Sequence, residues 1–171
     1  MKYEIKKQNL FNSGAQVIVH QVNCMGVMGS GVAKQVKNLY PNVFLEYCKA
    51  VRTLERKCLG GCLVVEAYPG LRIANLFGQY YYRGYKEDYT FDLPYEQPEL
   101  TESCEAIRFT NYEAFYRGLV RLKNELRENE KRIAFPYNIG CDRGGASWPI
   151  IENMIKCVFS DLDVEIIVCQ I

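Results

Sequence analysis

Several patterns that would indicate metal or disulfide chemistry are missing from this chain of 171 residues. It contains one histidine, His20, and its eight cysteines include no C-x-x-C pair of the kind that holds structural zinc. Several cysteines fall on apolar positions of expected helices and strands, as small buried thiols in a reducing compartment do. The sequence therefore predicts neither a metal site nor a disulfide framework, and no cofactor is expected.

Long hydrophobic runs and an excess of one charge are also missing. No apolar stretch approaches the roughly 20 residues of a membrane-spanning helix, and the N-terminus lacks the apolar segment of a secretory signal. The net charge is +1 and the basic residues are scattered, so the electrostatic surface of a duplex-binding protein is not expected. We therefore expect a soluble, cytoplasmic protein with no membrane and no duplex nucleic acid among its partners.

What the chain does contain is enough apolar residues for one core, in an alternating order of strands and helices. Hydrophobic residues make up 49% of the sequence, which predicts a single domain over residues 1–171. Periodicity predicts strands at 2–6, 17–19, 62–68, 72–77, 132–137 and 164–169, and helices at 32–40, 43–54, 112–128 and 150–159. This order predicts an α/β fold, with a mostly parallel sheet covered on both faces and a ligand at the carboxyl ends of the strands.

Local signals add three finer expectations. The last strand is apolar nearly throughout, which is typical of a central strand. Thr110 and Glu113 have the spacing of a capping box at the start of the third long helix. Ser147 stands where it could cap the last helix.

Two glycine-rich loops each follow a buried strand and precede a helix. The first contains Gly26, Gly29 and Gly31, and the second runs over residues 138–148. Unpaired amides and the positive end of a helix dipole converge at such a junction, which favours an anion. The sequence therefore predicts a pocket for a phosphate-containing small molecule.

Known phosphate motifs do not describe these loops. No stretch has the spacing of a P-loop, and no cysteine has an arginine six residues downstream, as a cysteine-phosphatase loop requires. The dinucleotide-binding pattern fits Gly29 and Gly31 but meets Lys34 where its third glycine belongs. What remains is a pair of loops that could hold two ends of one elongated anionic ligand.

A tyrosine-rich insertion at about 79–108 interrupts the alternating pattern. It has no sustained period and is longer than most loops of compact domains. Its many aromatic residues argue against disorder. A substrate lid and a surface flap that packs its own tyrosines both fit this composition.

Four segments in this order and spacing carry a family resemblance. They are residues 9–11 (NLF) after the first strand, 20–33 (HQVNCMGVMGSGVA), 73–79 (IANLFGQ), and 136–148 from Pro136 through IGC to Trp148. The chain resembles a macrodomain, in the branch that includes the terminal ADP-ribose glutamate glycohydrolases and the yeast-type ADP-ribose-1″-phosphate phosphatase. The resemblance implies a three-layer α/β/α fold with a mixed central sheet and a cleft for ADP-ribose.

The resemblance also implies ligand-binding roles for particular residues. Asn9, beside Leu10, stands where the family usually has an aspartate that accepts a hydrogen bond from adenine, and Asn23 matches the asparagine that holds the distal ribose. One loop would present backbone amides to the phosphates from one side: Gly29, Ser30, Gly31 and Val32. The other loop would do so from the opposite side: Ile139, Gly140, Cys141, Asp142, Arg143, Gly144 and Gly145.

Two side chains are candidates for catalysis. His20 precedes Asn23 by three residues, as in the phosphatase-like members, and an imidazole there could attack phosphorus or take a proton from water. The alternative is a core histidine satisfied by a backbone carbonyl. Asp142 could orient or activate water, or stabilise its loop through an Asx-turn. The lysine nucleophile of the glycohydrolase branch is replaced by Gln79, and its loop aspartate by Gly144.

Three functions fit these residues. The first is hydrolysis of ADP-ribose-1″-phosphate, with His20 and Asp142 catalytic and no metal. The second is removal of ADP-ribose or an acyl group from an adduct, including ADP-ribosylated macromolecules, by a water-mediated route. The third is binding of ADP-ribose without turnover.

Overall fold

The computed structural model of the chain describes residues 1–82 and 108–170. Most of the tyrosine-rich insertion at 79–108 lies outside this part of the chain. The strands are β1 (Lys2–Lys7), β2 (Val17–Val22), β3 (Cys62–Tyr68), β4 (Leu71–Phe77), β5 (Arg132–Pro136) and β6 (Glu165–Gln170). The α-helices are α1 (Gly31–Leu39), α2 (Pro41–Leu54), α3 (Tyr112–Glu125) and α4 (Trp148–Phe159), and short 3₁₀ turns lie at Leu10–Asn12 and Glu55–Cys58.

The strands form one mixed sheet in the order β1-β6-β5-β2-β4-β3. Every neighbouring pair is parallel except β3 and β4, which form an antiparallel hairpin. This confirms the expected α/β fold with a mixed sheet. The expectation that the last strand is central was wrong, because β6 lies second from the edge, between β1 and β5. Its apolar run instead reflects burial on both faces, since its residues alternate between the two cores.

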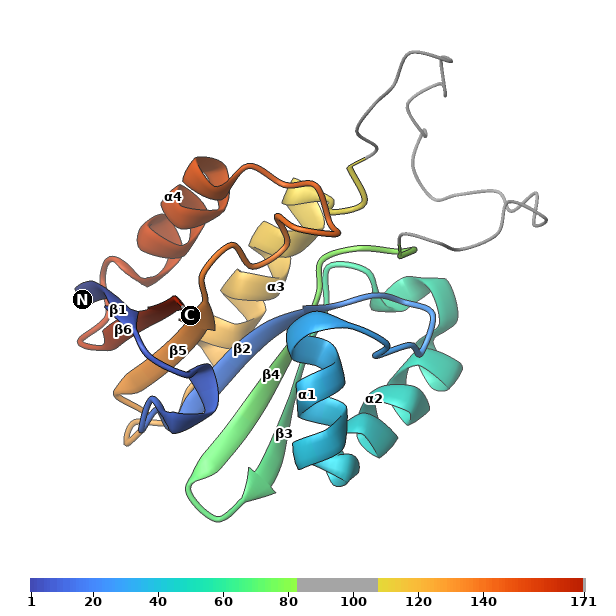
Figure 1. Cartoon of the computed structure of the whole chain (residues 1–171), viewed down its shortest axis with the longest axis horizontal. Helices are drawn as coiled ribbons and strands as arrows, with labels where there is room; N and C mark the ends of the chain where they lie inside the picture. The colour runs from blue at the N-terminus through green and yellow to red at the C-terminus, as the bar shows by residue number, and fades with distance from the viewer. Residues whose placement is uncertain (83–107, 171) are drawn as a thin grey trace.

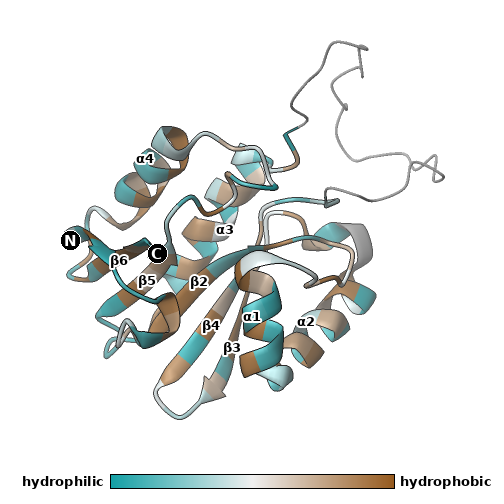
Figure 2. Ribbon diagram, in the orientation of Figure 1, coloured by the Kyte–Doolittle hydropathy of each residue, from teal (hydrophilic) through white to brown (hydrophobic). Residues whose placement is uncertain are grey.

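Two hydrophobic cores, one on each face of the sheet, make the structure three-layered (Figure 1). Helices α3 and α4 cover one face, where they pack on Val17 and Val19 of β2. Helices α1 and α2 cover the other face, over Ile18 and Val22. Figure 2 shows hydrophobic and hydrophilic residues alternating along these helices, the pattern of helices with one side against a sheet. Within the described residues, no helix is long and apolar enough to span a membrane.

Strand β2 is longer than its apolar run suggests. It continues beyond Val19 because its parallel pairing with β4 continues, with His20 opposite Asn75 and Val22 opposite Phe77. The sequence indicated that His20 stands at the end of the strand, whereas in the structure His20 lies within the sheet. The glycine loop follows from residue 23, and α1 begins at Gly31 with Ser30 as its N-cap.

Helix α3 begins differently from the prediction. Its N-cap is Asn111, whose side-chain oxygen accepts a hydrogen bond from the Ala114 amide at 2.9 Å, so the capping box at Thr110 was wrong. The Thr110 hydroxyl instead donates to the carbonyl oxygen of Gly140, 2.8 Å away in the second glycine loop. Ser147 is the N-cap of α4, as expected, although its side chain makes no capping hydrogen bond.

A buried ion pair joins β4 to the segment before β5. Arg72 Nη1 lies 3.0 Å from Glu130 Oε2, and the two side chains are only 9% and 5% exposed. Glu130 Oε2 also accepts a hydrogen bond from the Arg127 amide at 2.8 Å. The pair therefore satisfies backbone as well as side-chain groups where water does not reach.

We expect Glu130→Ala to lower the free energy of unfolding by about 3–5 kcal/mol, because it leaves the buried Arg72 guanidinium without its counter-charge. Urea-induced unfolding measures the change. The matched control is Glu46→Ala, which removes an exposed partner of Lys49 and should cost less than about 1 kcal/mol. Equal losses in the two variants would contradict the structural role of the buried pair.

Candidate functional site

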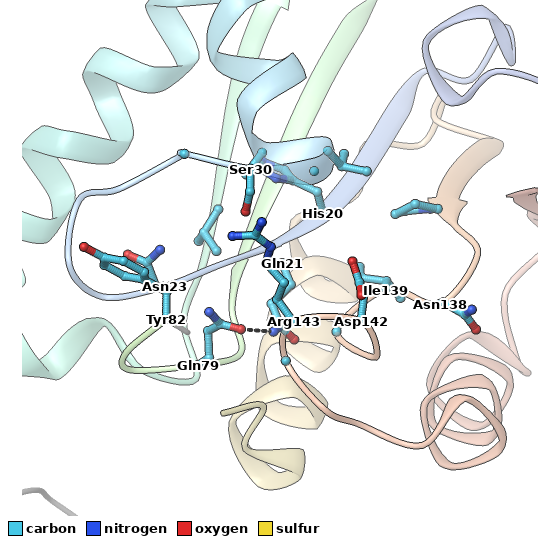
Figure 3. Close-up of a pocket in the computed structure, with 18 of the residues that line it drawn as sticks. His20, Gln21, Asn23, Ser30, Gln79, Tyr82, Asn138, Ile139, Asp142 and Arg143 are labelled. Carbon is cyan, nitrogen blue, oxygen red and sulfur yellow. Dashed lines mark hydrogen bonds between the residues drawn. The ribbon is translucent and has the colours of Figure 1, made fainter. Parts of the chain in front are cut away.

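A cleft of about 470 Å³ opens at the carboxyl ends of β2 and β5, between the two glycine loops (Figure 3). This volume falls within the roughly 300–1,000 Å³ typical of small-molecule sites. Most of the residues expected to bind a ligand line it: His20, Asn23, Gly29, Ser30, Gly31, Val32, Ile139, Gly140, Asp142, Arg143 and Gly144. Segments more than 100 residues apart in the sequence thus meet at the carboxyl ends of neighbouring strands.

Four expected residues do not line this cleft. Asn9 lies in a separate hollow with Lys7 and Gln170, and its side-chain oxygen accepts the Phe11 amide at 2.8 Å. Leu10 is a core residue. The Cys141 thiol donates a hydrogen bond to the carbonyl oxygen of Ile139. Gly145 has a φ of 69°, the left-handed conformation that the loop adopts at this residue. The structure therefore does not bring the expected adenine contact, Asn9, into the main cleft.

Asn23 shapes the first glycine loop from inside. Its Oδ1 accepts the Met25 amide and the Tyr47 hydroxyl, both at 2.9 Å, and its Nδ2 donates to the Val27 carbonyl at 2.7 Å. Tyr47 is a fully buried residue of α2, so the loop is fixed to the helical layer. A ligand can therefore use only the second N–H of Asn23 without breaking the loop.

The N-terminus of α1 forms the anion-binding wall of the cleft. Ser30 provides no side-chain cap, and the first amides of a helix have no partner within the helix. The amides of Gly31, Val32 and Ala33 and the positive end of the helix dipole therefore favour an anion here. Arg143, in the opposite loop, is the one arginine or lysine among the described residues that line the cleft.

The second glycine loop is fixed to the start of α3. The Gly144 carbonyl accepts the amides of Phe109 and Thr110, both at 2.9 Å. A Cβ atom on Gly144 would collide with the Thr110 hydroxyl and with the Gly140 carbonyl. Only glycine therefore allows the loop to lie this close to the segment before α3.

His20 is buried and partly satisfied. Its Nε2 donates to Asn75 Oδ1 at 2.8 Å, and Asn75 Nδ2 in turn donates to the Leu63 carbonyl at 3.0 Å. Its Nδ1 is buried and has no hydrogen-bond partner among the residues that the structure describes. Burial lowers the pKa of His20 to about 4, so at pH 7 the ring is neutral and Nδ1 offers a lone pair. The partner of the ring is a side-chain amide and not the backbone carbonyl considered from the sequence.

Asp142 and Arg143 are exposed at the mouth of the cleft. Among the described residues, no neighbouring amide donates to the Asp142 carboxylate, so the Asx-turn considered from the sequence is not formed there. Asp142 is also the one carboxylate among the described lining residues. The same part of the chain contains no group of histidine, cysteine and acidic side chains positioned to hold a metal.

Three polar side chains that line the cleft were not among the expected ligand-binding residues: Gln21, Tyr82, and Gln79, which was noted only as the replacement of a lysine nucleophile. Gln21 donates to Gln79 and to Thr110, and so links β2 to the ends of β4 and the start of α3. A glutamine next to a histidine within an otherwise apolar strand is the one local signal for this group. Its partners are 58 and 89 residues away, beyond any local pattern.

We expect Gly144→Ala to destabilise the protein by about 1–3 kcal/mol, because the added methyl group must displace backbone of the second loop. Gly29→Ala, in the first loop, is the matched control, because its Cβ would meet only Val27 Cγ1 at an ordinary 3.6 Å. Thermal unfolding compares the two. A control variant as unstable as Gly144→Ala would show that the close approach at Gly144 is not the cause.

Since His20 is the only histidine, the pH dependence of stability just below neutrality reports on it. Its folded pKa of about 4 lies below the usual value near 6.5. The unfolded chain therefore binds the proton first, and stability falls as pH drops from about 6.5 toward 4, by about 2 kcal/mol between pH 7 and pH 5. Urea unfolding at these pH values measures the loss. In parallel, the His20 ring protons should show no NMR titration above pH 5, and a midpoint near 6.5 would contradict the buried neutral ring.

Comparison with known proteins gives consistent matches. The model of the Macro domain family matches residues 19–87. The DNA ADP-ribosyl glycohydrolase of Mycobacterium tuberculosis is 27% identical over 162 residues, which are 94% of this chain and 40% of that protein. The chain spans 40% or less of the length of the curated relatives it matches.

Solved structures agree with the family model. The macrodomain of Thermus aquaticus DarG has a TM-score of 0.74 and 25% identity, with 99% of this chain and 98% of that chain covered. The structure of Thermosipho africanus DarTG in complex with ADP-ribose has a TM-score of 0.71 and 18% identity, with 98% of this chain and 41% of that chain covered. At that identity the second likeness concerns the fold alone.

Proposed function

We propose that this chain, which has the fold of a macrodomain and matches the Macro domain model over residues 19–87, is a macrodomain whose cleft binds the ADP-ribose group, and that a bond at the distal ribose is hydrolysed there. The observation that carries the proposal is the convergence of free α1 amides and Arg143 on one cleft. A diphosphate is the part of ADP-ribose that such a pair of walls would hold. The names of the curated relatives, DNA ADP-ribosyl glycohydrolases, support the same ligand class.

The ligand has a preferred direction in this proposal. Figure 3 shows Asn23 and Tyr82 on one side of the cleft and Asn138 on the other. We place the distal ribose beside Asn23, whose second amide N–H can reach a hydroxyl, and the adenosine toward Tyr137. Tyr137 lies 4.9 Å from the Trp148 ring, centroid to centroid, so an aromatic wall is already packed there. Asn9 is not required in this arrangement, because its side-chain oxygen already accepts the Phe11 amide.

Water is the attacking group that fits the side chains present. No lysine lines the cleft within the described residues, so the covalent route through a lysine imine has no support there. We propose that Asp142 takes a proton from the water as the water oxygen bonds to C1″ of the distal ribose. The bond from C1″ to its substituent breaks, and the substituent leaves with the electron pair and takes its proton from Asp142 or from solvent. His20, neutral at pH 7, would accept a hydrogen bond at Nδ1 and so help to orient the water or a ribose hydroxyl.

Two substrates fit this mechanism, each for its own reason. The phosphate monoester ADP-ribose-1″-phosphate is favoured by the placement of His20 three residues before Asn23, the pattern of the phosphatase-like members. An ADP-ribosyl group on DNA is favoured by the name of the curated relatives. Those relatives therefore give no support to the expectation that duplex nucleic acid is absent from the partners of this protein.

We expect Asp142→Asn to lower kcat by about 100-fold or more, because a carboxamide cannot accept the proton from water. The dissociation constant of ADP-ribose should change less than threefold, since Asp142 is not part of the anion-binding wall. Purified protein is incubated with ADP-ribose-1″-phosphate and, separately, with ADP-ribosylated DNA, and phosphate or free ADP-ribose is measured.

The matched control is Asp163→Asn, an exposed aspartate outside the cleft that should leave both values unchanged. Full turnover by Asp142→Asn would exclude this base. If the wild type binds ADP-ribose but turns over neither substrate, the protein is a binding domain and the proposed hydrolysis is wrong. Absence of ADP-ribose binding would overturn the proposed function altogether.

A further inference from the structure

A chain of hydrogen bonds runs along the floor of the cleft through Gln79, Gln21, Thr110 and Gly140. Gln21 Nε2 lies 2.6 Å from Gln79 Oε1 and 2.8 Å from Thr110 Oγ1. Thr110 Oγ1 lies 2.8 Å from the Gly140 carbonyl oxygen. Both glutamines line the cleft, and the mechanism above uses neither.

The direction of every bond in this chain follows from its last member. The Gly140 carbonyl can only accept, so the Thr110 hydroxyl uses its single proton on it. Thr110 Oγ1 must therefore accept from Gln21, which puts the nitrogen of Gln21 on this side. The same nitrogen then donates to Gln79, so Gln79 turns its oxygen to Gln21 and keeps both N–H groups of its nitrogen for other partners.

The two hydrogen bonds of Nε2 keep Gln21 in this orientation, in which Oε1 is buried with no hydrogen-bond partner among the described residues. Its side chain lies between two glycines, and a Cβ atom on Gly78 or Gly140 would come within 2.6 or 2.7 Å of Gln21 Oε1. A flipped Gln21 would turn an acceptor toward Gln79 Oε1 and Thr110 Oγ1, and both hydrogen bonds would be lost. Gln21 therefore fixes the carboxamide of Gln79 as a donor.

We propose that Gln79 recognises the group attached to the distal ribose by donating from Nε2 to a carbonyl or phosphoryl oxygen of that group, with Gln21 as the positioning residue. In Figure 3 the oxygen of Gln79 faces Gln21 along the dashed hydrogen bond, while its nitrogen turns away, to the side where Asn23 and Tyr82 lie. This inference rests on the proposed function, which places the distal ribose on that side.

The chemistry of a carboxamide defines the substrate class. An uncharged N–H donor suits an oxygen lone pair, whether the oxygen belongs to a nucleobase carbonyl of DNA or to a phosphate. It disfavours a substituent that presents only an ammonium group or hydrogen-bond donors at this point. Gln79 thus determines which adducts are accepted, although it takes no part in breaking the bond.

The test uses three variants and one control. Gln79→Met keeps the length of the side chain but has no donor, whereas Gln79→Glu still accepts from Gln21 and turns an oxygen to the cleft. Gln21→Met releases Gln79 from its partner. Gln35→Met, on the exposed side of α1, controls for a glutamine-to-methionine change outside the cleft. Each is assayed on ADP-ribose-1″-phosphate and on ADP-ribosylated DNA, and for binding of ADP-ribose itself.

We expect Gln79→Met to lower kcat/KM on the true substrate by about 10- to 100-fold, with the dissociation constant of ADP-ribose unchanged within twofold. Gln79→Glu should lose more, because the oxygen repels the acceptor of the substrate. Gln21→Met should lower kcat/KM in the wild-type background and have no further effect in the Gln79→Met background, since it acts through Gln79. Losses on ADP-ribosylated DNA identify the acceptor of Gln79 as a nucleobase carbonyl oxygen, and losses on ADP-ribose-1″-phosphate identify it as a phosphate oxygen.

Three results would overturn the inference: unchanged kcat/KM in Gln79→Met, full activity in Gln79→Glu, or an equal loss of ADP-ribose affinity. These failures differ from a failure of the proposed function, which appears in the wild type. If the wild type binds ADP-ribose but hydrolyses neither substrate, the affinity of Gln79→Met for the intact substrates, measured by competition, tests the contact instead: a weaker affinity supports it and an unchanged affinity excludes it. If the wild type does not bind ADP-ribose, both proposals are wrong.

Discussion

The cleft depends on one carbonyl group that holds two consecutive amides. Gly144 accepts from Phe109 and Thr110 and thereby fixes the loop after β5 to the segment before α3. The opposite wall is fixed by Asn23 and the buried Tyr47 hydroxyl. Ordering a loop costs about 1–2 kcal/mol per residue in backbone entropy. Because both walls are ordered by the fold itself, less of that cost falls on ligand binding.

How far the sequence predicts this structure depends on how local each signal is. The apolar strands and the two glycine loops are local, and both were placed correctly. The extension of β2 through His20 was not predicted, because a polar residue after an apolar run resembles the end of a strand. Its buried partner Asn75 is 55 residues away. The capping box predicted at Thr110 was wrong for the same reason. Local spacing suggests a cap, and only the fold brings the Gly140 carbonyl to the Thr110 hydroxyl.

Burial changes the chemistry that a lone histidine suggests. In water an imidazole titrates near pH 6.5 and can shuttle protons at neutrality. In this protein the ring of His20 is buried where it lines the cleft and its pKa falls to about 4, so at neutral pH it is an uncharged acceptor. The positive potential of the cleft then comes from the backbone amides of α1 and from Arg143, and not from the histidine. Anion binding should therefore be insensitive to pH where a histidine-based site would titrate.

An uncharged donor at Gln79 is consistent with such a cleft. A lysine there would place a second cation in the pocket that already contains Arg143, and the two charges would repel until an anion bound. A carboxamide avoids that repulsion, and its orientation is set by a backbone carbonyl that cannot change protonation state. The choice between substrates therefore depends on the direction of the hydrogen bond that Gln79 donates, while the strength of binding depends on the contacts to the diphosphate. The two functions can vary independently, because Gln21 and Gln79 contact neither α1 nor Arg143 through any hydrogen bond among the described residues.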